Sequence, residues 1–291
     1  MTELATLNER LANAQFIPAI PVHLFEDEHL DIKARINQFL ENCKRVFSGE
    51  KKGHIGVGLL EWLENVTRPE TGYTLAFFGS SVYSKTGCRI TDVDVMAFIG
   101  KNESTAAYRL SPYPRKVSLM RFYEHNVPSF GCSQNDFALL VSGPLLLYPS
   151  EPHGFALQTI ETARNLIGPE NSEKPLLARI PYAAAKVLNN QEWEFFESAE
   201  SARRFAGKIL TDNKAFYPLD PGVKPSLTSV NAVYEDQMNS MNDADLSVLT
   251  GAALNRLRVR GEHRERLCRA YSEKLREGRR YLIGKNTERL R

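Results

Sequence analysis

The sequence predicts an α+β protein, in which a small mixed sheet with flanking helices is followed by an α-helical domain. Short apolar runs typical of buried strands occur at residues 73–78, 92–98 and 145–148. After Pro149 the apolar residues recur at helical spacing instead. We therefore predict a first domain over residues 1–155 and a helical domain over residues 156–291.

The expected elements of the first domain follow in chain order. Apolar residues on one helical face predict helices over residues 29–47 and 57–66. YTLAFF at residues 73–78 lies between two glycines and predicts a buried strand. Residues 80–85 suit a short helix, residues 92–98 a second strand, and residues 117–126 either a helix or an edge strand. We expect two further strands over residues 135–143 and 145–148.

The second domain is expected to be helical throughout. Helical spacing extends over residues 156–167, 176–190 and 199–212, and over a long final segment from about Asp243. Three prolines in residues 216–229 predict a loop between helices.

Composition limits the class of protein. Hydrophobic content of 42% and charged content of 25% are ordinary for a globular protein, and a net charge of +2 favours no partner class. The four cysteines are widely spaced, which fits neither a disulfide framework nor a zinc site and favours a cytoplasmic setting. No apolar run reaches the roughly 20 residues that cross a bilayer, so we expect no membrane partner.

Two carboxylates at Asp92 and Asp94 are the first candidate site. Residues two apart on a strand share a face, so both acids project together while Val93 turns into the core with Val95 and Ala97. Paired acids favour a bound cation, and Mg²⁺ takes oxygen ligands of this kind.

A second pair with the same spacing, Asp243 and Asp245, serves as an internal comparison. It follows Asn242 at the start of a helical pattern, where acids stabilise the helix N-terminus. We therefore interpret it as structural.

The second candidate element is the turn at Gly79-Ser80, directly after the predicted strand. Glycine allows a close approach of the backbone to a ligand, and N–H groups at a helix start bind anions. A phosphate-binding turn before a metal-binding strand is the pairing that phosphoryl transfer from a nucleoside triphosphate requires.

These residues resemble the signature of the nucleotidyltransferase superfamily. Gly79-Ser80, eleven residues and then Asp92-Val93-Asp94 is similar to the spacing in CCA-adding enzymes and oligoadenylate synthetases, with Thr86 in the loop between. Polymerase β, poly(A) polymerases and antibiotic nucleotidyltransferases belong to the same superfamily. The resemblance is specific over residues 73–98, weaker as far as residue 148, and does not extend into the helical half.

The resemblance implies a set of site residues. Asp92 and Asp94 would hold two Mg²⁺ or Mn²⁺ ions, with a third carboxylate on a neighbouring strand. Asp136 is the candidate for this third acid, and Glu124 is the alternative. The nucleotide would bind at the following residues: Gly79, Ser80, Ser81, Lys85 and, from the helical domain, Lys186.

The expected reaction transfers a nucleoside monophosphate from an NTP to a hydroxyl or phosphate acceptor and releases pyrophosphate. We favour a small-molecule acceptor because the chain is short and nearly neutral. The alternatives are transfer to a tRNA 3′ end, supported by the basic segment from Arg256 onward, and synthesis of a signalling oligonucleotide. A non-catalytic nucleotide-binding protein is a further alternative, and whether Asp136 reaches Asp92 and Asp94 discriminates it.

Overall fold

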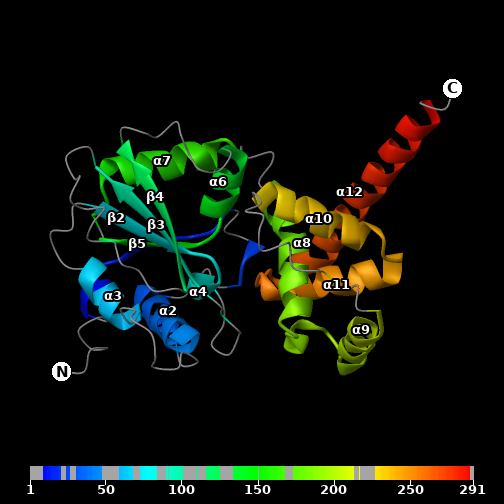
Figure 1. The fold of residues 1–291 in the computed structure, drawn as a ribbon, viewed down its shortest axis with the longest axis horizontal. Coiled ribbons are helices and arrows are strands. Elements are labelled where there is room, and N and C mark those ends of the chain that lie inside the picture. Colours follow the sequence, from blue (N-terminus) through cyan, green and yellow to red (C-terminus); the bar gives the residue numbers. More distant parts are fainter. Residues whose placement is uncertain are drawn as a thin grey trace. The chain divides into compact units, whose positions relative to one another are not determined.

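The chain folds as an α+β protein, as predicted, with a five-stranded mixed sheet and its helices followed by a region of helices alone (Figure 1). The computed structural model describes residues 9–20, 24–26, 31–47, 59–67, 73–83, 90, 92–100, 110, 116–124, 134–149, 151–167, 173–212, 216 and 227–288. The chain divides into two compact units. Unit 1 is Met1–Val22 with Glu28–Ser172, and unit 2 is His23–Asp27 with Glu173–Arg291.

The sheet of unit 1 has the strand order β1-β5-β2-β3-β4. Its strands are β1 (Gln15–Ile17), β2 (Tyr73–Phe78), β3 (Val93–Ile99), β4 (Val117–Tyr123) and β5 (Leu145–Tyr148). β3 and β4 are parallel, and the other neighbouring pairs are antiparallel. The predicted strands at residues 73–78, 92–98 and 145–148 are confirmed, and residues 117–126 supply an edge strand.

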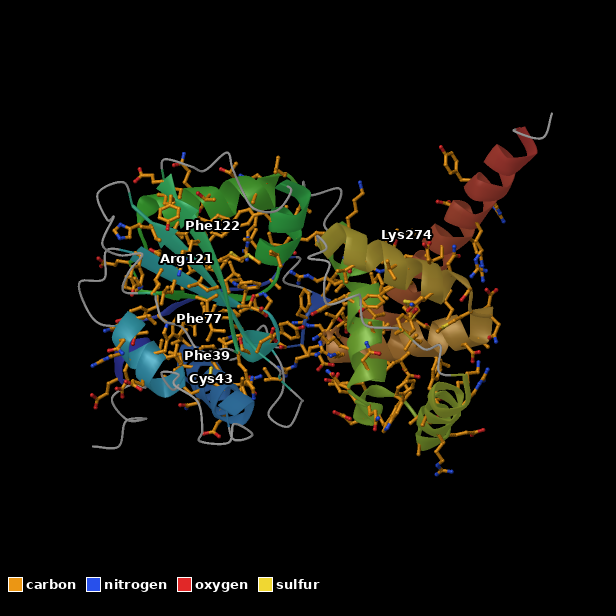
Figure 2. All side chains as sticks on the ribbon, viewed as in Figure 1. Phe39, Cys43, Phe77, Arg121, Phe122 and Lys274 are labelled. Atoms are coloured by element: carbon orange, nitrogen blue, oxygen red, sulfur yellow. The ribbon has the colours of Figure 1, made fainter. Side chains whose placement is uncertain are left out.

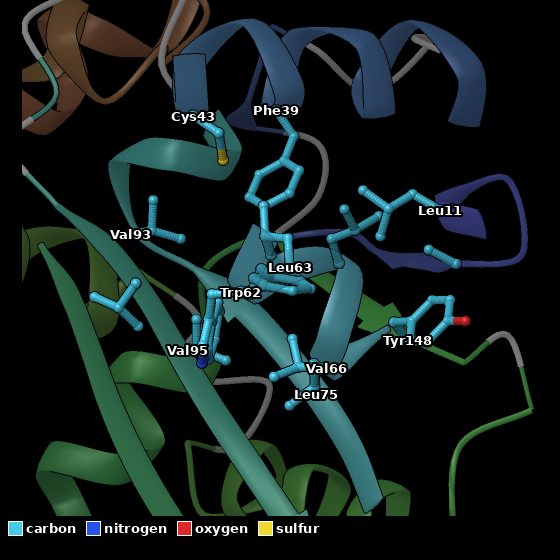
Figure 3. Packing of buried hydrophobic residues seen from close by; sticks show 14 of the residues in the cluster. Leu11, Phe39, Cys43, Trp62, Leu63, Val66, Leu75, Val93, Val95 and Tyr148 are labelled. Carbon is cyan, nitrogen blue, oxygen red and sulfur yellow. The ribbon is translucent and has the colours of Figure 1, made fainter. Parts of the chain in front are cut away.

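Helices cover both faces of this sheet (Figure 1). One face packs on α2 (Ile32–Phe47) and α3 (Leu59–Val66) (Figure 3). The core on this face includes Phe77 against Phe39, with ring centroids 4.9 Å apart (Figure 2). The other face packs on α6 (Gln134–Val141) and α7 (Gly154–Asn165). The alternation of strand side chains between these two layers determines which residues can meet beside Asp94.

The prediction of a strand at residues 135–143 is wrong, because this segment forms helix α6. Phe137, Ala138 and Val141 are buried, which is the i, i+1, i+4 pattern of a helix, while Leu139 and Leu140 are partly exposed. A short apolar run such as FALLV fits a buried strand and a buried helix equally well. Only its packing against the sheet separates the two.

The boundary between the units also lies later than predicted, after Ser172 instead of residue 155. Helix α7 buries Ala156, Ile160 and Ala163 in the same core as α6, so it belongs to the sheet unit. In the described part of the chain, no helix combines the length and the apolar character needed to cross a bilayer.

Unit 2 is built from α-helices around a separate core. They are α8 (Lys174–Asn189), α9 (Ala199–Asp212), α10 (Leu227–Asn239), α11 (Asp243–Arg256) and α12 (Gly261–Glu288), with a short 3₁₀ helix η4 (Trp193–Phe195) after α8. Residues 24–26 join this unit through a bridge between Phe25 and Val259 and a backbone hydrogen bond from Arg260 N–H to the carbonyl of Leu24.

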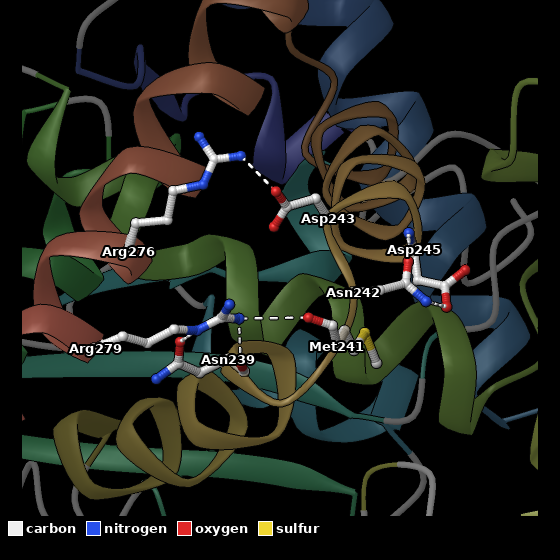
Figure 4. Close-up of polar contacts among 7 residues, drawn as sticks. All are labelled: Asn239, Met241, Asn242, Asp243, Asp245, Arg276 and Arg279. Carbon is white, nitrogen blue, oxygen red and sulfur yellow. Dashed lines mark hydrogen bonds and ion pairs between the residues drawn. The ribbon is translucent and has the colours of Figure 1, made fainter. Parts of the chain in front are cut away.

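The acid pair Asp243 and Asp245 is structural, as predicted (Figure 4). The side chain of Asn242 caps α11 by accepting a hydrogen bond from the backbone N–H of Asp245 at 2.8 Å. Asp245 is buried and forms ion pairs with Arg204 and Lys208, whereas Asp243 is exposed and pairs with Arg276 of α12 at 2.8 Å. Both acids are therefore occupied within the helical unit.

The ion pairs of Asp245 predict a pH-dependent contribution to stability. Burial alone would raise the pKa of the Asp245 carboxyl, but the bonds from Lys208 and Asn242 and the charge of Arg204 outweigh it, so the pKa lies below its ordinary value. A carboxyl with a lowered pKa stabilises the fold above its unfolded-state pKa of about 3.9, and this stability is lost as pH falls through the folded-state value.

We therefore expect Asp245→Asn to lower the free energy of unfolding by about 1–2 kcal/mol at pH 6, since both basic partners are half-exposed. In urea titrations from pH 6 to pH 3, the difference between wild type and variant should shrink below about pH 4. A difference that is constant with pH would show that the charge of Asp245 is not the cause. Asp243→Asn, at the exposed acid of the same pair, is the control.

Candidate functional site

The turn after β2 places Gly79 directly against Asp94. Gly79 has φ +70°, in the left-handed region that side chains other than glycine rarely adopt. A methyl group added at Gly79 would overlap Oδ2 of Asp94 and lie 3.2 Å from its Cγ. Glycine is therefore required here both for the backbone conformation and for the close approach of the turn to the carboxylate.

Hydrogen bonds inside unit 1 hold this turn in place. The carbonyl of Gly79 accepts from the N–H of Val82 at 3.1 Å, which starts the short helix α4 (Ser80–Tyr83). Ser81 Oγ donates to the carbonyl of Phe78 at 3.1 Å, and Nδ2 of the buried Asn42 donates to the carbonyl of Ser81 at 3.0 Å. The side chain of Ser81, predicted to bind nucleotide, is fully buried, so we assign its hydroxyl to the turn itself. Ser80 is partly exposed.

The antiparallel register of β2 and β3 explains why the turn and the acids meet. Phe78, the last residue of β2, is opposite Asp94, the second residue of β3. Val93, Val95 and Ala97 lie in the core against α2 and α3, as predicted, so Asp94 belongs to the opposite face of the sheet. Asp92 comes directly before β3, and both acids are partly exposed.

Strand β4 lies on the other side of β3 and places Ser118 beside Asp94. The two strands are parallel, with Asp94 opposite Ser118 and Met96 opposite Met120. Lys116, directly before β4, donates from Nζ to the carbonyl of Val46 at 2.5 Å. The sequence did not indicate that Ser118 lies beside Asp94, because residues 117–126 fitted either a helix or a strand. The register between two strands also cannot be deduced from one segment alone.

The expectation that the third acid lies on a neighbouring strand is not met by Asp136, because Asp136 belongs to helix α6. The next residue, Phe137, packs its ring on Phe122, with centroids 5.1 Å apart. Phe122 is four residues beyond Ser118, or about 13 Å along β4. The position of the Asp136 carboxylate itself lies outside the described part of the structure, so its role as a metal ligand remains a prediction.

Glu124, the alternative third acid, lies at the wrong end of the sheet. It follows Tyr123, which is opposite Ile99 and about 16 Å along β4 from Ser118. A carboxylate there is too far from Asp94 to share an ion with it. Among the residues whose side chains the structure describes, no three His, Cys, Asp or Glu gather in a possible metal site.

Lys85 and Lys186 were also predicted to bind the nucleotide. Lys85 is outside the residues that the structure describes. Lys186 belongs to α8 of unit 2, where its Nζ lies 5.4 Å from the ring centroid of Tyr182. Contact of either lysine with a triphosphate remains a prediction.

The basic C-terminal segment forms α12, and several of its cations have partners within unit 2. Arg266 pairs with Glu173 at 2.6 Å, Arg276 with Asp243 at 2.8 Å, and Lys274 with Glu235. Arg279 donates to the end of α10, at Asn239 and at the carbonyl of Met241 (Figure 4). These cations stabilise the helical unit, which weakens the argument for an RNA surface on α12.

The side chains at this site are of the kind that a hard divalent cation takes as ligands. Asp92 and Asp94 supply carboxylate oxygens and Ser118 a hydroxyl, all at one end of β3 and β4. Mg²⁺ is commonly held by one or two carboxylates together with water and substrate phosphates. These residues could hold such an ion, and the partly exposed Gly79-Ser80 turn lies beside Asp94.

A single methyl group tests this geometry. We expect Gly79→Ala to weaken nucleotide-dependent Mn²⁺ binding by about tenfold or more, because the left-handed conformation costs about 1–2 kcal/mol and Asp94 must also move. Binding is measured by electron paramagnetic resonance of free Mn²⁺. Gly154→Ala, where an added methyl meets nothing within 4 Å, is the matched control. Equal affinity in the two variants would show that the close approach of Gly79 to Asp94 is not needed for this binding.

Comparisons of the chain with protein-family models, with curated proteins and with solved structures found no match.

Proposed function

We propose that unit 1 binds a nucleoside triphosphate with a divalent cation and transfers its nucleoside monophosphate to an acceptor, releasing pyrophosphate. The observation that carries this proposal is the contact of the Gly79 turn with Asp94. A backbone turn without a side chain and a carboxylate pair are the two halves of a site for a metal-bound triphosphate. Residues 79 and 94 are brought together by the β2–β3 register.

In this proposal each residue has a separate task. The backbone N–H groups and the hydroxyl of Ser80 bind the phosphates, and Asn42 and Ser81 keep the turn in position. Asp92 and Asp94 would hold Mg²⁺, which would supply positive charge for the phosphates. The acceptor oxygen forms a bond to the α-phosphorus, and a hydroxyl acceptor releases its proton to solvent. The bond from that phosphorus to the bridging oxygen breaks, and pyrophosphate leaves with the electron pair.

A small molecule is the acceptor class that we favour. The cations of α12 that pair with Glu173, Glu235 and Asp243 are already partly neutralised, so they offer less to an RNA backbone than the sequence suggested. Transfer to an RNA 3′ end and synthesis of a signalling oligonucleotide use the same donor chemistry and are outcomes of the test below.

A second candidate function is nucleotide binding without transfer. The observation that favours it is Ser118, a neutral residue at the position of β4 opposite Asp94. A hydroxyl there cannot accept a proton from the attacking group as a carboxylate does.

The experiment incubates the protein with each α-labelled NTP and Mg²⁺ or Mn²⁺, with total RNA and a metabolite extract as separate acceptor pools. Label in the metabolite pool supports the proposal as stated, and label only in RNA moves the acceptor to the second class. Nucleotide-dependent Mn²⁺ binding without labelled product supports the non-catalytic candidate. If the protein showed neither nucleotide-dependent Mn²⁺ binding nor transfer, both candidate functions would be contradicted.

A further inference from the structure

We propose that Ser118 is the third residue of the site beside Asp92 and Asp94, and that the site consequently holds one divalent ion instead of two. This inference rests on the proposed function, since it concerns the ion bound with the nucleotide. It concerns how many ions that site retains and which residue limits the number.

The side-chain alternation of β4 puts Ser118 on the face of Asp94. Val117 and Leu119 pack with the core under α2 and α3, and Met120 packs with the opposite core under α6 and α7. On β3, Val93 and Val95 take the first layer and Met96 the second. Ser118 therefore shares its layer with Met120, as Asp94 does with Met96.

The parallel register makes Ser118 the nearest residue of β4 to Asp94 in that layer. The two residues are direct partners, and neighbouring strands lie about 4.8 Å apart. The next residue of the same layer, Met120, is opposite Met96 and packs into the core. Ser118 itself is partly exposed. Of the described residues on β4, Ser118 is the one positioned to complete the site.

A hydroxyl in this position determines the charge of the site. Asp92 and Asp94 together carry two negative charges, and the triphosphate would add its own negative charge on the donor side of the site. A second ion would need a further anionic ligand, and the number of charged ligands strongly tunes cation affinity. The serine hydroxyl stays neutral and offers a cation only its oxygen lone pairs. Ser118 therefore permits a phosphate-bound ion on the acids and disfavours a second ion on the acceptor side.

The experiment measures ion stoichiometry. Purified full-length protein with α,β-methylene-ATP, which is not cleaved between these phosphates, is titrated with Mn²⁺, and free Mn²⁺ is followed by electron paramagnetic resonance. We expect one bound ion per wild-type chain. Ser118→Asp should add a second bound ion. The dissociation constant of this second ion should be lower by about tenfold or more than that of any residual second site in wild type.

Three variants keep the inference testable. Ser118→Asn matches the size of aspartate without its charge and should stay at one ion. Ser118→Ala should also stay at one. Asp136→Asn should leave the wild-type count unchanged. Far-UV circular dichroism confirms folding, and if Ser118→Asp does not fold, the wild-type count decides.

The outcomes separate this inference from the function beneath it. Two ions in wild type, reduced to one by Asp136→Asn, would overturn the role of Ser118 while leaving the proposed function standing. Two ions unaffected by Asp136→Asn would overturn the inference as well. Absence of nucleotide-dependent Mn²⁺ binding in wild type would overturn the proposed function and this inference together.

Discussion

Asp94→Asn is expected to lower nucleotidyl transfer by about a thousandfold or more while leaving the protein folded. Asparagine has the shape of aspartate, so the packing against Gly79 is kept, but the charge that holds the cation is lost. A bound metal contributes several kcal/mol of transition-state stabilisation, and about 1.4 kcal/mol corresponds to a factor of ten. The measurement is the initial rate of pyrophosphate release with saturating NTP, alongside Mn²⁺ affinity.

The second acid pair supplies a matched control for this variant. Asp243→Asn makes the same chemical change in the other Asp-x-Asp sequence, at a carboxylate that is exposed and paired with Arg276. We expect it to retain wild-type transfer and Mn²⁺ affinity. If Asp94→Asn behaved like Asp243→Asn, Asp94 would not be a metal ligand. Equal losses in both variants would instead indicate a general effect of charge on folding.

The strand-turn-strand at residues 73–98 was predictable because its signals are local. Gly72 and Gly79 bound an apolar run that forms β2 over the predicted residues, Tyr73–Phe78. The need for glycine at residue 79 follows from φ +70° and the nearby Asp94 carboxylate, whereas the sequence predicted only a close approach of this backbone to a ligand. One hairpin-like unit therefore carries most of the information on the candidate site.

The position of Ser118 beside Asp94 was not predictable from the sequence, because it depends on pairing between distant segments. Only the parallel register of β3 and β4 places Ser118 opposite Asp94. Asp136 was a candidate because it precedes an apolar run that fitted a strand. In the structure this run forms α6, whose Phe137 and Val141 pack against the sheet. The residue composition of this segment did not distinguish a strand from a helix.

The acid pair at Asp243 and Asp245 shows the opposite case, in which neighbouring residues were enough. Asn242 before the pair predicted a helix cap, and the cap bond to the N–H of Asp245 is present. Asp245 pairs with Arg204 and Lys208, which both lie on α9. The residues around the cap did not predict these partners. Local chemistry gave the role of the pair, and tertiary packing gave its ion pairs.

In unit 2, the largest effect on stability is expected from Glu192. Its carboxylate is 2% exposed and accepts from Nε of Arg256 at 2.7 Å and from Nδ2 of Asn190 at 3.0 Å. Arg256, at the end of α11, is only 4% exposed. The pair joins the end of α11 to the segment between α8 and η4. Asn255 also donates to the carbonyl of Phe195, the last residue of η4, at 2.7 Å.

Glu192→Ala should lower the free energy of unfolding by about 3–5 kcal/mol, because it leaves the guanidinium of Arg256 buried without its carboxylate. Glu192→Gln keeps the volume and one acceptor oxygen, so its loss should be smaller. Urea unfolding followed by circular dichroism measures both. Glu265→Ala removes an exposed partner of Arg269, at 4.0 Å, and should change stability little.

The ranking of these three variants tests the physical cause. Burial makes the Glu192 pair costly to break, although its formation from hydrated charges gains little. If Glu192→Ala cost no more than Glu265→Ala, Arg256 must reach water or another acceptor once Glu192 is removed. Equal losses from alanine and glutamine would place the effect in the charge alone. A smaller loss from glutamine would show that filling the space and accepting one hydrogen bond already satisfy part of what Arg256 requires.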